Sequence, residues 1–576
     1  MTSSQSASSS SDNLSKANLS YYHGVSVEPL IGRTLGDHFR LIAATNAGRP
    51  AIVDCKQQIR YTYDEFREQV DLLARGFIDL GVNRGDRVGI WSTNSVQWLT
   101  TFLAVSSIGG ILVNLNPAYR VNELEYALRH SGTKVLLIIP QFKTSNYISM
   151  VESLLSHGAQ ESTLPDLERV IVIGDRDKTP DSFMTLSEVL DSAKRISPSV
   201  LEARMSELGF DDAVNIQYTS GTTGLPKGVT LSHHNLLNNG LAAAHAMELD
   251  NSARFCIPMP FYHCGGMISS ALAAISVGAA IVIPGPFFDE NDVLPALEQE
   301  KCTHASGVPT MFITQLEHPK FSQYDLSSLR GGFLAGAPCP VQLMRRVAGQ
   351  FHMKDVVILY GLTEASPLMT CTKVADSLEV RATTVGRAIP GIEVKVIDPL
   401  TGAVVPLGVQ GEICSRGHGV MLGYWRNEAA TNDAVDAAGW LHSGDLGVMK
   451  EDGLVNITGR KKDMIIRGGE NVYPKEVEDA LLDHPSISQA QVFGIPDRTN
   501  GEEVVAWIML KQGTTTSGEE IGSWLKDRIS YFKIPKHIKI VTEFPMTVTG
   551  KIQKFVMRKL MIEELGLEDA NAIQTA

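Results

Sequence analysis

Apolar segments of two lengths alternate along the first half of the chain. They predict strands at 87–91, 110–115 and 134–140, with helices at 96–106 and 121–130 between them. Strands that alternate with helices predict a mainly parallel sheet covered on both faces. The same alternation returns after Val214, so we expect an α/β domain built from more than one doubly wound layer.

The pattern changes twice in the second half. Between 373 and 423, short β-rich segments separated by Gly and Pro predict a small sheet or barrel. Residues 459–474 then concentrate charge and glycine, and beyond them a helix (475–483), two strands (490–496, 504–510) and a helix (521–529) predict a compact α/β unit. We therefore expect a tail at 1–20, an N-terminal domain at 21–459, a hinge at 460–463 and a C-terminal domain at 464–576.

Length and charge narrow the class of protein. A chain of 576 residues exceeds the roughly 250 to 300 at which single cores stop growing, so at least two domains are expected. A net charge of -13 argues against a protein that holds a nucleic-acid backbone, because that requires clustered Lys and Arg. Any anionic ligand must therefore be bound by local chemistry.

The expected location is a reducing compartment, because the seven cysteines form no CxxC pair. The Ser-rich residues 1–20 bury too little apolar surface to become ordered, so we expect them to be mobile. Because the segment is Ser-rich, a mitochondrial matrix presequence is the alternative to a cytoplasmic protein, although no Arg precedes Arg33.

The apolar stretch 268–283 is interrupted by Ser and Gly and is shorter than the ~20 residues of a spanning helix. It predicts a buried helix and a strand, with no transmembrane segment.

The strongest chemical signal is the sequence YTSGTTGLPKGV at 218–229. Glycines allow backbone N–H groups to approach a phosphate, hydroxyls donate further hydrogen bonds, and a lysine adds charge. The segment lacks the Gly-Lys-[Ser/Thr] ending of a Walker A loop. It predicts an ATP-binding loop made of Thr219, Ser220, Gly221, Thr222, Thr223, Gly224, Leu225, Pro226 and Lys227.

Other segments are ambiguous when taken alone. The Thr-Glu pair in YGLTEASP (360–367) is typical of a helix start, and Asp445 in GWLHSGDLG also suits a turn. Lys551 in TVTGKIQK would usually be a solvated surface charge. Cys264 in MPFYHCGGM has no neighbouring ligand set at zinc spacing, so we expect neither a metal site nor a nucleophile there.

Taken together and in order, these motifs resemble the adenylate-forming superfamily of acyl-CoA synthetases, 4-coumarate-CoA ligases, luciferases and peptide-synthetase adenylation domains. The resemblance runs from about 35 to 565. It is closest to the medium-chain acyl-CoA synthetases of the family-member-two type, through LSYYHGVSVEPL, MPFYHCGGM, RGGENVYPKEVED and FPMTVTGKIQKFVMRK. It implies that a fatty acid reacts with ATP to form an acyl-adenylate and pyrophosphate, and that the acyl group then passes to coenzyme A with release of AMP.

The resemblance also assigns residues to the nucleotide. It implies that Thr363 and Glu364 hold the phosphates and Mg²⁺, with Glu364 as the metal ligand, and that Asp445 accepts hydrogen bonds from the ribose. The remaining implied nucleotide contacts are Gly336, Ala337 and Pro338 at the adenine, Tyr360, and Arg460. Lys551 is implied as the mobile cation that bridges the acid and the α-phosphate, where such a group lowers the barrier electrostatically.

Further positions concern the acid, coenzyme A and the hinge. The resemblance implies an acyl pocket with His263 at its mouth and with Gly307 and Gly361. It implies a rotation of the C-terminal domain about Lys462, which brings Gly468 and Gly469 beside the pantetheine path. Ile466 departs from the lysine of some aryl-acid ligases and luciferases. His233 and His234 are expected only to begin a helix.

Three alternatives remain open: an aryl or 4-coumarate-type ligase, a long-chain ligase, and an inactive scaffold that binds fatty acid or nucleotide. Only a short acidic helix and tail follow Lys551, which favours a free thiol acceptor over a carrier domain. A monomer or homodimer is expected.

Overall fold

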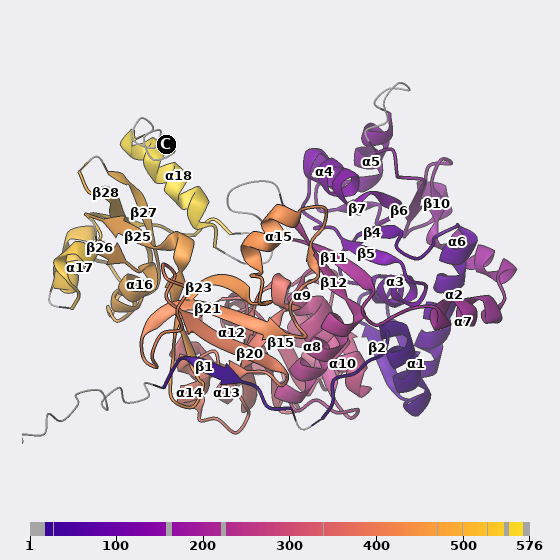
Figure 1. Ribbon diagram of the computed structural model, residues 1–576, viewed down its shortest axis with the longest axis horizontal. Helices are drawn as coiled ribbons and strands as arrows, with labels where there is room; N and C mark the ends of the chain where they lie inside the picture. The colour runs from indigo at the N-terminus through magenta and orange to yellow at the C-terminus, as the bar shows by residue number, and fades with distance from the viewer. Residues whose placement is uncertain are drawn as a thin grey trace, which may run out of the picture.

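The computed structural model describes residues 18–26, 28–156, 164–219, 226–337, 339–468, 470–497, 499–526, 528–546 and 552–567. Figure 1 shows a large part made of the indigo to orange segments and a small yellow unit at the C-terminal end. No helix within these ranges has the length and apolar character needed to cross a membrane.

Two sheets form the frame of the large part. The first has eight strands in the order β10 (Met184–Thr185), β9 (Arg169–Val172), β6 (Thr133–Ile138), β4 (Arg87–Trp91), β5 (Ile111–Asn114), β11 (Ala213–Thr219), β12 (Lys227–Ser232) and β22 (Gly423–Tyr424). It is parallel from β10 to β11 and antiparallel in its last two pairings.

The second sheet has nine strands. Their order is β19 (Arg387–Ala388), β18 (Leu368–Cys371), β17 (Asp355–Gly361), β16 (Gly331–Ala335), β15 (His304–Gly307), β13 (Arg254–Cys256), β14 (Ala280–Ile283), β2 (Pro50–Asp54) and β3 (Ile59–Thr62). Its strands are parallel from β17 to β2.

Helices cover both faces of each sheet. The main core lies between the sheets and includes apolar residues of α1 (Leu35–Thr45), α2 (Tyr63–Asp79), α3 (Val96–Ser107), α8 (His233–Ala246) and α10 (Ala273–Val277). The outer faces are covered by α4 (Val121–Ser131) and α5 (Tyr147–Leu155) on the first sheet, and by α11 (Glu290–Gln299), α12 (Pro309–Leu316) and α13 (Val341–Gln350) on the second. The predicted doubly wound α/β fold is confirmed.

Several shorter helices complete the large part. They are α6 (Leu186–Ser192), α7 (Pro198–Ser206), α9 (Cys264–Gly266), α14 (Leu378–Thr383) and α15 (Glu428–Ala434). A small hairpin pairs β7 (Gln141–Phe142) with β8 (Ser145–Asn146). A π-helical segment, Met267–Leu272, leads into α10 and then β14, so the apolar stretch 268–283 is a buried helix and a strand, as predicted.

The β-rich section is an antiparallel five-stranded sheet. It runs in the order β1 (Tyr21–His23), β20 (Ile392–Ile397), β21 (Gln410–Gly417), β23 (Leu441–Met449) and β24 (Val455–Arg460). Ser20 is fully buried and its hydroxyl donates to the carbonyl of Pro406, while Leu19 pairs with Pro406. Placing residues 18–20 in the mobile tail was therefore wrong, because they pair with a segment nearly 390 positions away. Residues 1–17 lie outside the described ranges.

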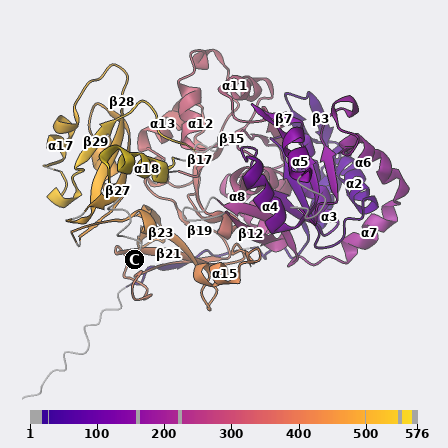
Figure 2. The ribbon, with the colours of Figure 1, turned by 90° about the horizontal axis from the view of Figure 1, so that it is seen from above.

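The C-terminal unit is a mixed sheet with helices. Its strands are β26 (Glu470–Val472), β25 (Ile465–Arg467), β28 (Gly501–Leu510), β27 (Ile487–Asp497) and β29 (His537–Ile540), and its helices are α16 (Pro474–Leu482), α17 (Gly518–Lys526) and α18 (Lys554–Leu565). Helix α17 begins and ends three residues before the predicted 521–529. Figure 2 shows this unit at one end of the molecule, on the side of β21 and β23.

Candidate active site

Parallel strands bring three of the predicted positions to one edge of the nine-stranded sheet. Gly307 ends β15, Gly336 follows β16, and Tyr360 lies near the end of β17. The register pairs Gly307 with Leu334 and Ala335 with Leu359, so the three ends are level. Open α/β sheets bind ligands at the carboxyl ends of their strands, which makes this edge the candidate active site.

Asp445 joins this edge from the five-stranded sheet. The residue is 8% exposed, and the Tyr360 hydroxyl donates to its Oδ2 at 2.7 Å. Arg460 stands opposite Asp445 in the β23–β24 pairing, and its Nε lies 3.1 Å from Oδ1. Burial, followed by the Asp445 carboxylate, raises the pKa of Tyr360 well above its usual value, so the phenol remains a donor. An ionised carboxylate offers about four lone-pair sites, which leaves capacity for ribose hydroxyls.

Glu412 supports the turn that carries Asp445. Its side chain is almost fully buried, and Oε1 accepts the backbone N–H of Gly444 at 3.2 Å. Oε2 lies 3.2 Å from the Lys461 ammonium and 3.5 Å from Nδ1 of His442. One buried carboxylate thus binds both the Asp445 turn and the start of the predicted hinge. No local sequence pattern relates 412 to 444 and 461, so Glu412 was not among the predicted site residues.

Thr363 and Glu364 begin a short 3₁₀ turn, Thr363–Ala365, directly after β17. The Tyr424 hydroxyl donates to Oε1 of Glu364 at 2.8 Å, and the Met421 N–H donates to the Glu364 carbonyl at 2.9 Å. The Lys227 ammonium lies 4.7 Å from the centre of the Tyr424 ring. A phosphate-loop lysine and the predicted metal ligand therefore share one neighbour, Tyr424, which was not among the predicted site residues.

The described ends of the phosphate loop form the base of a hairpin. Thr219 at the end of β11 pairs with Lys227 at the start of β12, and its hydroxyl donates to the Lys227 carbonyl at 3.4 Å. The Pro226 carbonyl accepts the Tyr126 hydroxyl at 3.0 Å. The predicted residues Ser220, Gly221, Thr222, Thr223, Gly224 and Leu225 lie outside the described residues, as do Pro338, Gly469 and Lys551. Gly336 and Ala337 are exposed at the edge.

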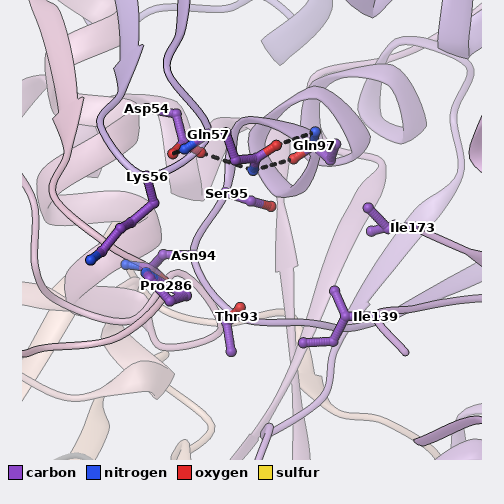
Figure 3. A pocket seen from close by; sticks show the side chains of 10 residues that line it. All are labelled: Asp54, Lys56, Gln57, Thr93, Asn94, Ser95, Gln97, Ile139, Ile173 and Pro286. Carbon is purple, nitrogen blue, oxygen red and sulfur yellow. Dashed lines mark hydrogen bonds between the residues drawn. The ribbon is translucent and has the colours of Figure 1, made fainter. Parts of the chain in front are cut away.

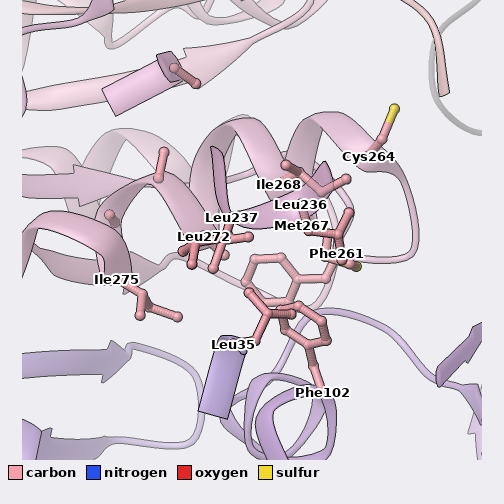
Figure 4. Packing of buried hydrophobic residues seen from close by; sticks show 14 of the residues in the cluster. Leu35, Phe102, Leu236, Leu237, Phe261, Cys264, Met267, Ile268, Leu272 and Ile275 are labelled. Carbon is pink, nitrogen blue, oxygen red and sulfur yellow. The ribbon is translucent and has the colours of Figure 1, made fainter. Parts of the chain in front are cut away.

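His263 and Cys264 reach the same region from the start of α9. Nδ1 of His263 accepts the Gly265 N–H at 3.2 Å, and the Cys264 sulfur lies 3.6 Å from both that nitrogen and the Thr363 hydroxyl. Figure 4 shows the Cys264 sulfur directed away from the apolar cluster around Phe261 and Met267. No group of three or more His, Cys, Asp or Glu in the described part of the chain is placed to hold a metal ion.

At the two glycines predicted for the acyl pocket, neighbouring atoms leave no room for a side chain. A Cβ on Gly307 would meet the Phe312 ring at 2.8 Å, and a Cβ on Gly361 would meet the Pro367 carbonyl oxygen at 1.8 Å. Both positions therefore require glycine because other atoms approach closely. Their assignment to an acyl pocket stays a prediction.

The hinge region is polar and tightly turned. Lys462 lies in the turn Lys461–Asp463 between β24 and β25. Partial desolvation and then the Arg460 guanidinium lower its pKa, while Asp463, Asp445 and Glu364 act in the opposite direction. Beyond it, Ile466 is half-exposed and its N–H donates to Glu502 at 3.0 Å, and the Gly468 N–H donates to the Asn500 carbonyl.

A cavity of about 280 Å³ lies elsewhere, where β2, β4, β6, β9 and β14 end (Figure 3). None of the predicted site residues that the structure describes lines it. Its amides are already engaged: Gln57 bonds Gln97 and Asp54, and Asn94 donates to the Met259 carbonyl. It is separate from the candidate active site.

Comparison with known proteins agrees with this geometry. The family model described as AMP-binding enzyme matches residues 39–425, and the one described as AMP-binding enzyme C-terminal domain matches residues 476–551. The protein YngI of Bacillus subtilis (strain 168), whose name carries the words acyl-CoA synthetase, is 43% identical over 548 residues, which cover 94% of this chain and 99% of YngI. The mitochondrial medium-chain acyl-CoA ligase ACSF2 of Macaca fascicularis is 40% identical over 561 residues, covering 95% and 90%.

A solved structure gives the same result for the fold. The anthranilate CoA ligase AuaEII in complex with anthranoyl-AMP superposes with a TM-score of 0.82 at 26% identity, covering 94% of this chain and 99% of that one. Sequence motifs, the shared strand edge and the matches over both domains all agree, and the chain belongs to the AMP-binding enzyme family.

Proposed function

We propose that this protein is an AMP-forming acyl-CoA ligase that activates fatty acids, with medium-chain acids as the preferred class. The observation that carries the proposal is a set of contacts around the end of β17. Tyr360 on β17 contacts Asp445, and Glu364, just beyond β17, shares its neighbour Tyr424 with Lys227. The names of YngI and of the macaque relative support a carboxylic acid as the substrate and coenzyme A as the acceptor of the acyl group.

ATP is proposed to lie along this edge. Asp445 would accept the ribose hydroxyls, with Tyr360 and Arg460 fixing its two oxygens. Gly336, Ala337 and Pro338 would border the adenine. The loop Thr219–Lys227 would hold the phosphates, because its lysine and hydroxyls suit an anion.

The residues present also fit Mg²⁺. Glu364 and Thr363 offer a carboxylate and a hydroxyl, the hard oxygen ligands that this ion prefers, and Tyr424 engages Oε1 of Glu364. When bound, the ion would neutralise charge on the phosphates. Glu364 would be its protein ligand, with Thr363 beside the phosphates.

The first half-reaction joins two anions. A carboxylate oxygen of the fatty acid attacks the α-phosphorus of ATP, the bond from the α-phosphorus to the bridging oxygen breaks, and pyrophosphate leaves. We propose that Lys551 bridges the reacting oxygens, since a preorganised cation at such a point is worth on the order of 10²- to 10³-fold in rate. Lys227 would hold the departing phosphates.

The second half-reaction transfers the acyl group. The thiol of coenzyme A loses its proton and attacks the acyl carbonyl, the bond from the acyl carbon to the phosphate oxygen breaks, and AMP leaves. We propose that the C-terminal domain turns about Lys462, so that Gly468 and Gly469 border the pantetheine. His263 would stand at the mouth of the acyl pocket, with Gly307 and Gly361.

The substrate class is tested by a series of acids. Saturated acids from four to sixteen carbons, benzoate and 4-coumarate would each be supplied with ATP, Mg²⁺ and coenzyme A, and CoA-dependent AMP would be measured. The expected optimum is at medium chain length. An optimum at an aryl acid or at long chains would replace the proposed class, and ATP binding without AMP from any acid would identify an inactive scaffold.

Lys551 is tested by separating the half-reactions. Lys551→Ala is expected to abolish acyl-AMP formation while thioester formation from supplied acyl-AMP continues. Lys559→Ala is the matched control, because that lysine lies exposed on α18 and forms an ion pair with Glu563 at 3.8 Å. Pyrophosphate release at the normal rate in Lys551→Ala would refute the assignment.

Location and assembly are part of the proposal. We propose a cytoplasmic protein, with the mitochondrial matrix as the alternative, in line with seven free cysteines and with relatives of bacterial and mitochondrial origin. A C-terminal fluorescent tag in cells separates these two. A monomer or homodimer is proposed, and light scattering at several concentrations would identify a larger assembly.

A further inference from the structure

A short segment, 421–425, links two parts of the candidate active site through its backbone. The Met421 N–H donates to the Glu364 carbonyl at 2.9 Å. The Leu422 N–H donates to Thr230 at 2.9 Å and the Trp425 N–H to Gly228 at 2.7 Å, both on the strand that Lys227 begins. The segment therefore holds the Glu364 turn and the phosphate-loop strand in one fixed relation.

Tyr424 adds a side-chain link at the centre of this segment. It is partly buried, its hydroxyl donates to Glu364 Oε1 at 2.8 Å, and its ring lies 4.7 Å from the Lys227 ammonium. A phenol bonded to one carboxylate oxygen leaves the other with its lone pairs available. A cation over an aromatic ring is attracted by the electron-rich ring face. The two ends of one side chain thus engage an anion and a cation.

We propose that Tyr424 is a positioning residue that sets Glu364 and Lys227 for a divalent metal bound to ATP. This inference rests on the proposed function for the identity of the nucleotide. The hydroxyl fixes the rotation of the Glu364 carboxylate through Oε1, so that Oε2 would be the oxygen available to a bound metal. The ring keeps the Lys227 side chain extended toward the phosphates. Tyr424 itself contacts neither of the reacting atoms.

The two roles belong to different atoms and can be separated. Tyr424→Phe removes the hydroxyl and keeps the ring, so it frees Glu364 and leaves the Lys227 contact. Tyr424→Leu removes both. Tyr63→Phe is the matched control, because Tyr63 is fully buried and donates at 2.7 Å to the carbonyl of Ala279, which precedes β14 at the amino end of the parallel strands.

Binding of Mn²⁺, a paramagnetic substitute for Mg²⁺, would be measured by electron paramagnetic resonance with ATP present. Binding of ATP without metal would be measured by calorimetry. In Tyr424→Phe the Glu364 side chain is free and must be ordered when the metal binds, which weakens binding by about 3- to 10-fold. We therefore expect a loss of Mn²⁺ affinity of that size, whereas the affinity for metal-free ATP should not change. Tyr424→Leu is expected to weaken metal-free ATP binding as well. Tyr63→Phe should match the unchanged protein in both.

The outcomes are distinct. Unchanged Mn²⁺ affinity in Tyr424→Phe, an equal loss in Tyr63→Phe, or no binding of Mn²⁺ and ATP by the unchanged protein would overturn the inference. A protein that binds Mn²⁺ and ATP with the expected pattern but makes no acyl-CoA would refute the proposed function and leave the role of Tyr424 standing. Thermal unfolding of Tyr424→Phe within a degree or two of the unchanged protein is expected, and a large drop with parallel loss of both binding steps would show a merely structural role.

Discussion

The hydroxyl of Tyr360 and the carboxylate of Asp445 meet at 2.7 Å, although 85 positions separate them in the chain. Tyr360 comes from the end of a parallel strand and Asp445 from an antiparallel hairpin, so this contact joins two sheets. It also fixes Oδ2 of Asp445 beside the strand edge where the nucleotide is proposed to lie. The carboxylate is thereby oriented before any ligand arrives.

Tyr360→Phe should weaken ATP binding with little effect on the rate at saturating ATP. A hydrogen bond to a charged group contributes about 1.5 to 3 kcal/mol, part of which other donors recover, so we expect the KM for ATP to rise about 5- to 20-fold. Steady-state kinetics with ATP varied would measure this. An unchanged KM would mean that Asp445 needs no fixed orientation.

Asp445→Ala should remove the preference for ribose. The unchanged protein is expected to favour ATP over 2′-deoxy-ATP, because a carboxylate that accepts the 2′-hydroxyl contributes about 10-fold or more to binding. In Asp445→Ala the two nucleotides should bind alike, each more weakly. Competition binding with both nucleotides provides the measurement, and a retained preference would exclude Asp445 from the ribose contact.

Glu412→Ala should destabilise the turn that carries Asp445. The substitution leaves the Gly444 N–H and the His442 ring without their carboxylate, which costs about 1 to 3 kcal/mol of unfolding free energy. Lys461→Ala serves as the comparison, because the partly exposed ammonium in the same ion pair contributes less than about 1 kcal/mol. Urea unfolding of both variants tests this order, and equal effects would contradict it.

Acid should destabilise the folded protein through three buried histidines. Burial lowers the pKa of His233, His304 and His418 to about 4. The unfolded chain binds these protons near pH 6.5, so between about 6.5 and 4 it holds more protons than the folded chain. The unfolding free energy should therefore fall as pH falls through this window, by up to about 1.4 kcal/mol per pH unit and histidine.

Urea unfolding at pH 7 and pH 5 would measure this slope. His233→Asn should reduce it, because asparagine can accept the Leu35 N–H that His233 Nδ1 accepts at 3.1 Å but takes up no proton. A slope of the opposite sign, or one that His233→Asn leaves unchanged, would exclude this histidine as a source of the pH dependence.

The sequence predicted what depends on local pattern. The strands and helices between Arg87 and Ile138 agree with the structure within one or two residues, because strand and helix patterns are short and repeat. Asp445 was predicted to contact the ribose because its segment resembles a family motif, and the structure adds its contact with Tyr360. The helix at 521–529 was placed three residues late, since helix ends are set by capping and packing rather than by apolar spacing.

Contacts between distant segments could not be predicted in this way. Tyr424 lies in a two-residue strand, and its contacts follow from pairing with β12, almost 200 positions earlier. Glu412 likewise contacts Gly444 and Lys461, and no single motif links these three positions. Residues 21–23 were placed inside the N-terminal domain, but the pairing of β1 with β20 across about 370 positions was not predicted, and neither was the order of residues 18–20 beside it.

That first strand has a practical consequence for anyone who shortens the chain. Trimming to residue 30 would strip β20 of its neighbour and leave a row of unsatisfied amide and carbonyl groups open to another molecule's strand. It would also leave empty the space that the Tyr22 ring fills against Gly453. Recombinant proteins that start at or before Asn18 should not aggregate, whereas those that start after Gly24 should aggregate through the exposed edge of β20.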